Sequence, residues 1–324
     1  MRFSKTLALG AVATGVNAQR PSNTSICDYY TTALLKNNTA DNQATLLTLV
    51  VNTVVIGNYT QPNVGVIVPG ILAPGKYNGV DVNLLPYFNG DLASSNRGGS
   101  NGVSINFLDD GGATPLTMNK PSNGTTSNQY FLLTHLYQFF GSLLGCSEQG
   151  MPGFDAYMGH PSMYEVHKFM DLDEAELGYF ITQVGLAASS FGVADSDVQA
   201  VGTALNSTFG YRCSAPATVI KAQGPQLQAI CIADDCPLAT SAVCASYSSA
   251  TEPASATPTP SSYSSGAPTS SYPVSTPAST TPAASSTPAS GSPTSSPSSV
   301  PTGGAATNGL GLAAVAGGIA AFLL

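Results

Sequence analysis

The chain has three histidines, and one of them, His167, lies in the run Tyr157–Met170 among apolar residues. An imidazole on a short helix, beside apolar side chains from neighbouring helices, is the ligand that a haem iron takes from many proteins. His167 is therefore our candidate metal ligand. The alternative is a histidine packed in an ordinary core, in which case this run carries no chemistry.

Other chemistries have less support in the residue pattern. One acidic group precedes a predicted helix and consists of Asp171, Asp173, Glu174 and Glu176. It lacks the spacing and the glycine turn of an EF-hand calcium loop, so we interpret it as helix capping. No Gly-x-Ser-x-Gly motif of a serine hydrolase is present, and no motif indicates a glycosidase carboxylate pair. We therefore predict no catalytic residues.

Four long segments are predicted to be helical: Asn42–Ile56, Gln129–Leu144, Asp173–Phe191 and Asp195–Phe209. The second has apolar residues at helical spacing and then Gly145 as a stop, and acidic residues open the last two. The first is rich in β-branched residues, so helix and strand remain open for it. A short helix around Met163–Met170 carries His167.

Residues from about 60 to 127 differ from the helical segments, because they are rich in Gly, Asn and Pro. Two apolar runs in this stretch, Val64–Val68 and Val103–Leu108, could form the strands of a small hairpin. A loop of this length inside a compact domain is usually functional or an insertion with minor structure of its own. We predict an irregular insertion that contains a β-hairpin.

Several features between Tyr130 and Phe209 follow one another in a recognisable order. They are Leu-Gly-Cys at 144–146, Tyr-x-Gly at 157–159, Met163, His167, Phe180 and Gly192-Val193. This order resembles that of the truncated haemoglobins, the two-over-two globins. The resemblance implies a mainly α, globin-like domain in which His167 is the proximal ligand of a haem.

The resemblance also implies the rest of a haem pocket. Its apolar wall would be formed by Leu132, Leu136, Phe140 and Met163. At the rim, His135 would meet a haem propionate, and the alternative is a plain solvated or capping histidine. The ligand-binding tyrosine that the family has on its second helix is replaced by Asn52-Thr53. Apolar residues at helical spacing also suit a simple core, so both interpretations stay open.

The two ends of the chain predict its compartment. Arg2 and Lys5 precede an apolar stretch and a small-residue cleavage site, which predicts a secretory signal over residues 1–18. Residues 246–302 are mostly Ser, Thr, Pro and Ala, a composition typical of a disordered, O-glycosylated stalk. Residues 303–324 end in the apolar run Leu310–Leu324 and predict a glycosylphosphatidylinositol (GPI) anchor signal, with attachment at Gly303. A tail-anchored helix is the alternative.

Glycosylation sequons and cysteines agree with secretion. The sequon asparagines are Asn23, Asn37, Asn58, Asn123 and Asn206. The cysteines are Cys27, Cys146, Cys213, Cys231, Cys236 and Cys244, an even number that predicts three disulfides. Cys146 and Cys213 each follow the end of a predicted helix, so we expect them to pair or to lie near one another. The last three cysteines would hold an irregular segment together.

The folded part is thus predicted to span residues 19–245 as one mainly α domain. A net charge of −8 and a pI near 4.6 argue against nucleic acid as a partner. The expected partners are the lipid anchor, cell-wall polysaccharide and haem. Our leading hypothesis is a GPI-anchored glycoprotein, on the outer face of the plasma membrane or in the cell wall, that binds haem through His167. The alternative is a structural or adhesive wall glycoprotein without a cofactor.

Overall fold

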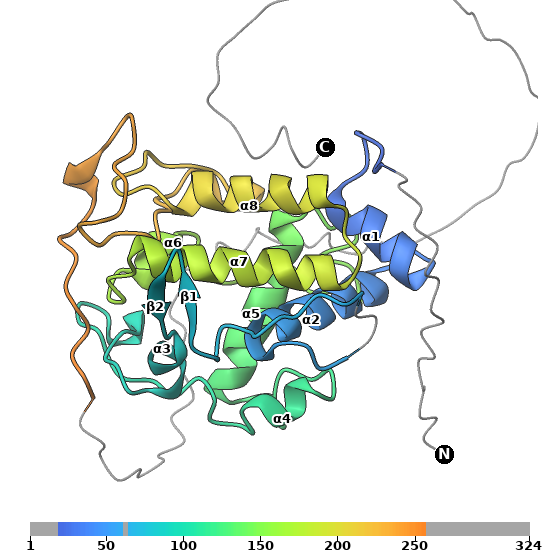
Figure 1. The fold of residues 1–324 in the computed structure, drawn as a ribbon, viewed down its shortest axis with the longest axis horizontal. Helices are drawn as coiled ribbons and strands as arrows, with labels where there is room; N and C mark the ends of the chain where they lie inside the picture. Colours follow the sequence, from blue (N-terminus) through green and yellow to red (C-terminus); the bar gives the residue numbers. More distant parts are fainter. Residues whose placement is uncertain (1–18, 61–63, 257–324) are drawn as a thin grey trace, which may run out of the picture. The chain divides into compact units, whose positions relative to one another are not determined.

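The computed structural model describes residues 19–60 and 64–256, and this part of the chain is mainly helical (Figure 1). The predicted signal segment, Gly303 and most of the predicted stalk lie outside the described residues. The helices are α1 (Ile26–Leu35), α2 (Ala40–Ile56), α3 (Leu85–Asn89), α4 (Ala113–Leu116), α5 (Asn128–Leu143), α6 (Met163–His167), α7 (Glu174–Ser190) and α8 (Asp195–Phe209). The predicted mainly α class is confirmed.

The four long helices form within a few residues of their predicted bounds, as α2, α5, α7 and α8. Local signals explain the last three. Asp173 and Glu176 form a capping box at the start of α7, which confirms that this part of the acidic group caps a helix. Gly145 has a φ of 73° just after α5, as expected of a helix stop. α8 differs in one detail, because its N-cap is Ala194 and the expected cap, Asp195, is its first helical residue.

Burial decides the structure of α2, for which sequence left helix and strand open. The residues buried along this helix are Ala40, Gln43, Leu46, Leu47, Leu49, Val51, Asn52, Thr53, Val54 and Val55. α2 packs against both α5 and α7, and α7 packs in turn against α8 (Figure 1). Their shared apolar surface forms one continuous core, and its burial outweighs the weak helix propensity of β-branched residues.

The sequence did not predict α1, which lies immediately before α2. Ser25 caps it by accepting a hydrogen bond from the Asp28 backbone N–H at 3.0 Å. Ile26, Cys27 and Tyr30 on this helix are buried in the main core. Helix α1, which packs on the main core, therefore starts only a few residues after the predicted signal segment.

The insertion contains a hairpin, but not the one that the apolar runs predicted. Strands β1 (Gly75–Tyr77) and β2 (Val80–Val82) pair antiparallel across Asn78-Gly79, both of which have positive φ. Asn-Gly is the preferred dipeptide for such a turn. The predicted strand pairing is wrong, because Val64–Val68 forms no strand and Val103 makes only an isolated bridge.

The segment after residue 245 is packed on the domain. The Ser248 backbone N–H donates to the Tyr164 hydroxyl at 2.7 Å. Farther along, Leu92 and Ser255 form an isolated antiparallel bridge, and the Ala93 N–H donates to the Ala254 carbonyl at 2.8 Å. The predicted boundary between domain and stalk at residues 245 and 246 therefore falls inside the packed region.

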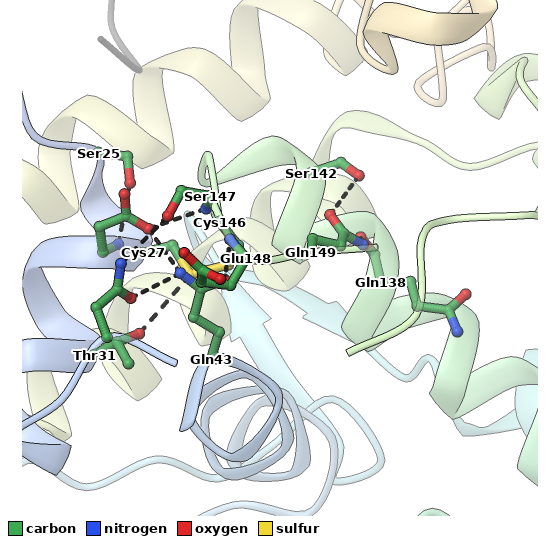
Figure 2. The surroundings of a disulfide bond; sticks show 12 residues. Ser25, Cys27, Thr31, Gln43, Gln138, Ser142, Cys146, Ser147, Glu148 and Gln149 are labelled. Atoms are coloured by element: carbon green, nitrogen blue, oxygen red, sulfur yellow. Dashed lines mark hydrogen bonds between the residues drawn. A yellow bond between two sulfur atoms is a disulfide. The ribbon is translucent and has the colours of Figure 1, made fainter. Parts of the chain in front are cut away.

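Three disulfides form, as predicted, but the expected pairing of Cys146 with Cys213 is wrong. The pairs are Cys27–Cys146, Cys213–Cys244 and Cys231–Cys236. The first joins α1 to the turn after α5 (Figure 2). In the same place the Cys27 N–H donates to the Leu144 carbonyl at 3.1 Å. Three disulfides indicate an extracellular or secreted protein. Among the described helices, none has the length and apolarity needed to cross a membrane.

Candidate functional site

His167 is the last residue of α6, and one of its ring nitrogens has a fixed partner. Its Nδ1 lies 2.7 Å from the backbone carbonyl oxygen of Met163, four residues earlier. A carbonyl oxygen can only accept, so Nδ1 carries the proton and Nε2 keeps its lone pair. Within the described residues, Nε2 makes no hydrogen bond. This is the arrangement in which a metal-binding imidazole is oriented by its second nitrogen.

The protonation state of His167 also suits a ligand. The side chain is half-buried, and burial lowers the pKa of its imidazole, while the hydrogen bond to Met163 acts in the opposite direction. A histidine whose pKa is below its usual value is neutral at pH 7. The neutral ring is the form that binds a metal ion.

Two polar side chains hold the N-terminus of α6 and so position His167. Ser162 is the N-cap and accepts from the Glu165 N–H at 3.2 Å. Gln228 is fully buried, and its Oε1 accepts from the Met163 N–H at 3.1 Å. The Nε2 of Gln228 donates to the Pro161 carbonyl, also at 3.1 Å. Hydrogen bonds with Ser162 and Gln228 thus fix the backbone at the start of α6.

Part of the insertion bridges α5 and α6. The short 3-10 helix η1 (Asn96–Gly98) contacts α6, where the Asn96 side chain donates to the Glu165 carbonyl at 3.0 Å. On the other side, Arg97 donates to the Asn128 side chain at the start of α5. The Arg97 guanidinium also lies over the Phe107 ring, 5.4 Å from its centre. The insertion therefore brings a positive charge close to the two helices that carry the predicted site.

His135 lies on α5 in an aromatic and basic environment. Its ring centre is 6.0 Å from that of Tyr157 and 6.5 Å from that of Phe131. Burial lowers the pKa of His135, and the nearby charge of Arg97 lowers it further. No carboxylate in the described part of the chain stabilises a positive charge on this ring, so His135 is neutral at pH 7. A neutral imidazole beside Arg97 can donate a hydrogen bond to an anionic group.

The four predicted wall residues have two different environments. Leu132 and Leu136 on α5 are half-buried. Phe140 and Met163 are buried in the main core, where the Phe140 ring lies 6.5 Å from that of Phe180. Such an arrangement suits a pocket with a packed floor, and it equally suits an ordinary core.

Asn52 occupies the place where the resemblance implies a ligand-binding tyrosine, and its polar atoms are engaged elsewhere. It is fully buried, accepts from the Tyr137 hydroxyl at 2.6 Å, and donates to the Leu116 carbonyl at 3.2 Å. These bonds tie α2 to α5 and to α4. Asn52 is therefore a structural crosslink between helices.

The structure thus places the predicted site residues on two elements, α5 and α6, which Tyr157 and η1 connect. Tyr157 contacts His135 through its ring and donates from its hydroxyl to the His160 carbonyl at 2.9 Å. In the described part of the chain, no group of three or more His, Cys, Asp or Glu side chains could hold a metal ion.

The roles of Gln228 and Arg97 could not be predicted from the residue pattern. Gln228 lies in an irregular segment with no periodicity, and one glutamine gives no signal of burial. Arg97 is one of only ten basic residues in the chain, and this scarcity was the one available clue.

No family model matches the chain, and neither a curated protein nor a solved structure does.

All five sequon asparagines are exposed in the structure. Asn58 and Asn123 have side-chain hydrogen bonds, from the Val68 N–H to Asn58 at 2.6 Å and from Asn123 to the Asp110 carbonyl at 3.2 Å. Exposure makes each position compatible with a glycan. Glycosylation itself stays a prediction.

Proposed function

We propose that residues 19–256 form a globin-like, haem-binding domain of a secreted cell-surface glycoprotein. The observation that carries this proposal is the hydrogen bond from His167 Nδ1 to the Met163 carbonyl at 2.7 Å. It leaves Nε2 as a neutral, oriented donor atom at the end of a short helix. A histidine in an ordinary core would also need an acceptor for its ring N–H, so the titration described below separates the two interpretations.

A bound haem would supply an iron centre that takes a small ligand or exchanges an electron. The chain's own residues have simpler tasks. His167 offers the axial nitrogen, and Gln228 and Ser162 hold the helix that carries it. Leu132 and Leu136 would supply apolar contacts to the bound group and limit the access of water. Because they offer no hydrogen bond, we expect weak stabilisation of a polar ligand such as oxygen.

An absorption titration tests this proposal. Haemin is added to the full secreted chain, and a Soret band with a stoichiometry of one is expected. His167→Ala should abolish the band or reduce the affinity at least about 100-fold, the upper range for a lost metal-orienting group. Lys76→Ala is the control, since Lys76 lies on β1 and its side chain forms only an exposed ion pair with Asp81. A wild-type spectrum without a Soret band, or equal affinities for wild type and His167→Ala, would contradict the proposal.

We also propose that the chain is GPI-anchored at the cell surface through Gly303. The three disulfides support secretion, and the residue pattern of the C-terminal segment motivates the anchor. Phosphatidylinositol-specific phospholipase C should release the protein from cells. Replacement of residues 302–306 by bulky charged residues should prevent its anchoring. Protein that stays on the membrane after phospholipase treatment would favour a tail-anchored helix.

A structural or adhesive glycoprotein without a cofactor is the second candidate. It is favoured by the burial of Phe140 and Met163 in the continuous core, since a core without a cofactor places them in the same way. The same titration separates the two functions. Stoichiometric haem in protein isolated from cells would exclude the second candidate.

A further inference from the structure

A cavity of about 330 Å³ lies where α7 begins and α8 ends. None of the predicted haem residues lines it. Pockets for small molecules in proteins have volumes of about 300–1,000 Å³, so this cavity has room for a single small ring.

The lining of this cavity combines aromatic rings with a carboxylate. Tyr77 comes from β1 and Tyr211 follows α8. The Tyr77 ring lies against α7 at Gly178, where an added Cβ would come within 2.3 Å of the ring. Glu174, the first residue of α7, is exposed and adds an acceptor. Aromatic rings pack on the C–H faces of a pyranose, and a carboxylate accepts hydrogen bonds from its hydroxyl or acetamido groups. The chemistry of the cavity therefore matches a sugar.

A glycosylation sequon lies in the wall of the same cavity. Asn206 lines it from the last turn of α8, is exposed, and precedes Ser207 and Thr208. In contrast with Asn58 and Asn123, its side chain has no hydrogen bond to the described residues. Of the five sequon asparagines, it alone lines this cavity. A sugar attached to its side-chain nitrogen would begin at the wall of the cavity that both tyrosines also line.

We propose that the cavity is a sugar-binding site, and that the first N-acetylglucosamine of a glycan on Asn206 occupies it. The sugar ring packs on Tyr211 and Tyr77, and Glu174 accepts one of its hydrogen bonds. The glycan thereby joins the end of α8 to the start of α7 and to the hairpin. This inference is independent of haem binding.

Thermal unfolding of the full chain, secreted from a glycosylating host, tests the proposal. Asn206→Gln should lower the unfolding midpoint by about 2–4 °C, the shift expected for one lost contact in a domain of this size. Asn23→Gln, which also removes an exposed sequon but lines no cavity, should change the midpoint by less than about 1 °C. Tyr211→Ala should lower the unfolding midpoint as much as Asn206→Gln does, and the double variant should lower it no further than either single variant. The proposal would be overturned if the two single-variant decreases in midpoint added up in the double variant. Equal midpoints for Asn206→Gln and Asn23→Gln would also overturn it.

Two further comparisons identify the source of the sugar. An endoglycosidase that leaves one N-acetylglucosamine on each asparagine should preserve the stability of the wild type. An added N-acetylglucosamine dimer should bind to the Asn206→Gln variant, in which the cavity is open, and not to the glycosylated wild type. Equal binding to both chains would overturn occupation by the chain's own glycan and would assign the cavity to polysaccharide from the surroundings.

Discussion

Arg20 and Asp197 form an ion pair in which nitrogen and oxygen are 3.1 Å apart, although 177 positions separate them in the chain. Only 12% of the Arg20 side chain and 10% of the Asp197 side chain are exposed. The Tyr30 hydroxyl donates to the other oxygen of the same carboxylate at 2.8 Å. The first residues after the predicted signal segment are thus joined to both α1 and α8.

Removing the charge of Asp197 should destabilise the fold. Asp197→Asn leaves the guanidinium of Arg20 desolvated without a countercharge, and we expect the free energy of unfolding to fall by about 3 kcal/mol. Urea denaturation of the full chain measures this loss. Lys76→Ala is the control, because it breaks the exposed pair of Lys76 with Asp81 and should cost under about 1 kcal/mol. Equal losses in both variants would be inconsistent with a buried, energetically important pair.

The disulfides should differ in what they contribute to stability. Cys27 and Cys146 are 119 positions apart, whereas Cys231 and Cys236 are separated by 5. A crosslink that closes a long loop removes more entropy from the unfolded chain, about 5 kcal/mol here against about 2 kcal/mol for the short loop. Chemical denaturation of the two paired Cys→Ala variants checks this order. A greater loss on removing the short-loop disulfide would contradict it.

Gln228 should influence both stability and haem binding. Gln228→Leu leaves the Met163 N–H and the Pro161 carbonyl without their buried partner, at a cost of about 2 kcal/mol. Because these groups hold the start of α6, we expect a weaker Soret titration as well. Gln226→Leu is the matched control, since Gln226 donates its side-chain bond only to the nearby Gln223 carbonyl. The proposed positioning role fails if both variants bind haemin equally well.

The carboxyl group of Glu176 should make stability depend on pH. Burial raises its pKa from 4.5 to about 7, while the Asp173 N–H and the Tyr87 hydroxyl donate to its oxygens. Between pH 4.5 and 7 the folded chain therefore binds more protons than the unfolded chain, so the free energy of unfolding falls as pH rises through this window. We expect the fall due to this group to be about 1–2 kcal/mol, since Glu176 is partly exposed.

The comparison of wild type with Glu176→Gln isolates this effect, because glutamine keeps the capping hydrogen bond without titrating. Urea denaturation at pH 4.5 and at pH 7.5 should show that the stability of wild type relative to the variant decreases at the higher pH. A relative stability that increases with pH would mean that the pKa of Glu176 is lowered in the folded protein.

Local patterns predicted the parts of the fold that local interactions determine. α5, α7 and α8 were found from apolar spacing and from residues such as Asp173 and Gly145, whose effects extend over one helical turn. α2 could not be decided in this way, because its β-branched residues become helical only through packing on α5 and α7. The apolar runs predicted the hairpin at the wrong place, because the Asn78-Gly79 turn determines where the two strands pair.

Contacts between residues that are far apart in the chain could be predicted much less well from the sequence. The pairing of Cys27 with Cys146 depends on α1, which the sequence did not predict. His167 was selected from its neighbours in sequence, and those neighbours do form a short helix. The groups that hold this helix, Gln228 above all, lie about 65 positions away and carry no pattern that a single sequence reveals.

The bridge between Leu92 and Ser255 joins the end of the described chain to the insertion. Residues 254–256, the last ones that the structure describes, pair with residues 91–93 of the insertion through two backbone hydrogen bonds and this bridge. A force applied beyond residue 256 would therefore act first on these backbone contacts between residues 254–256 and the insertion.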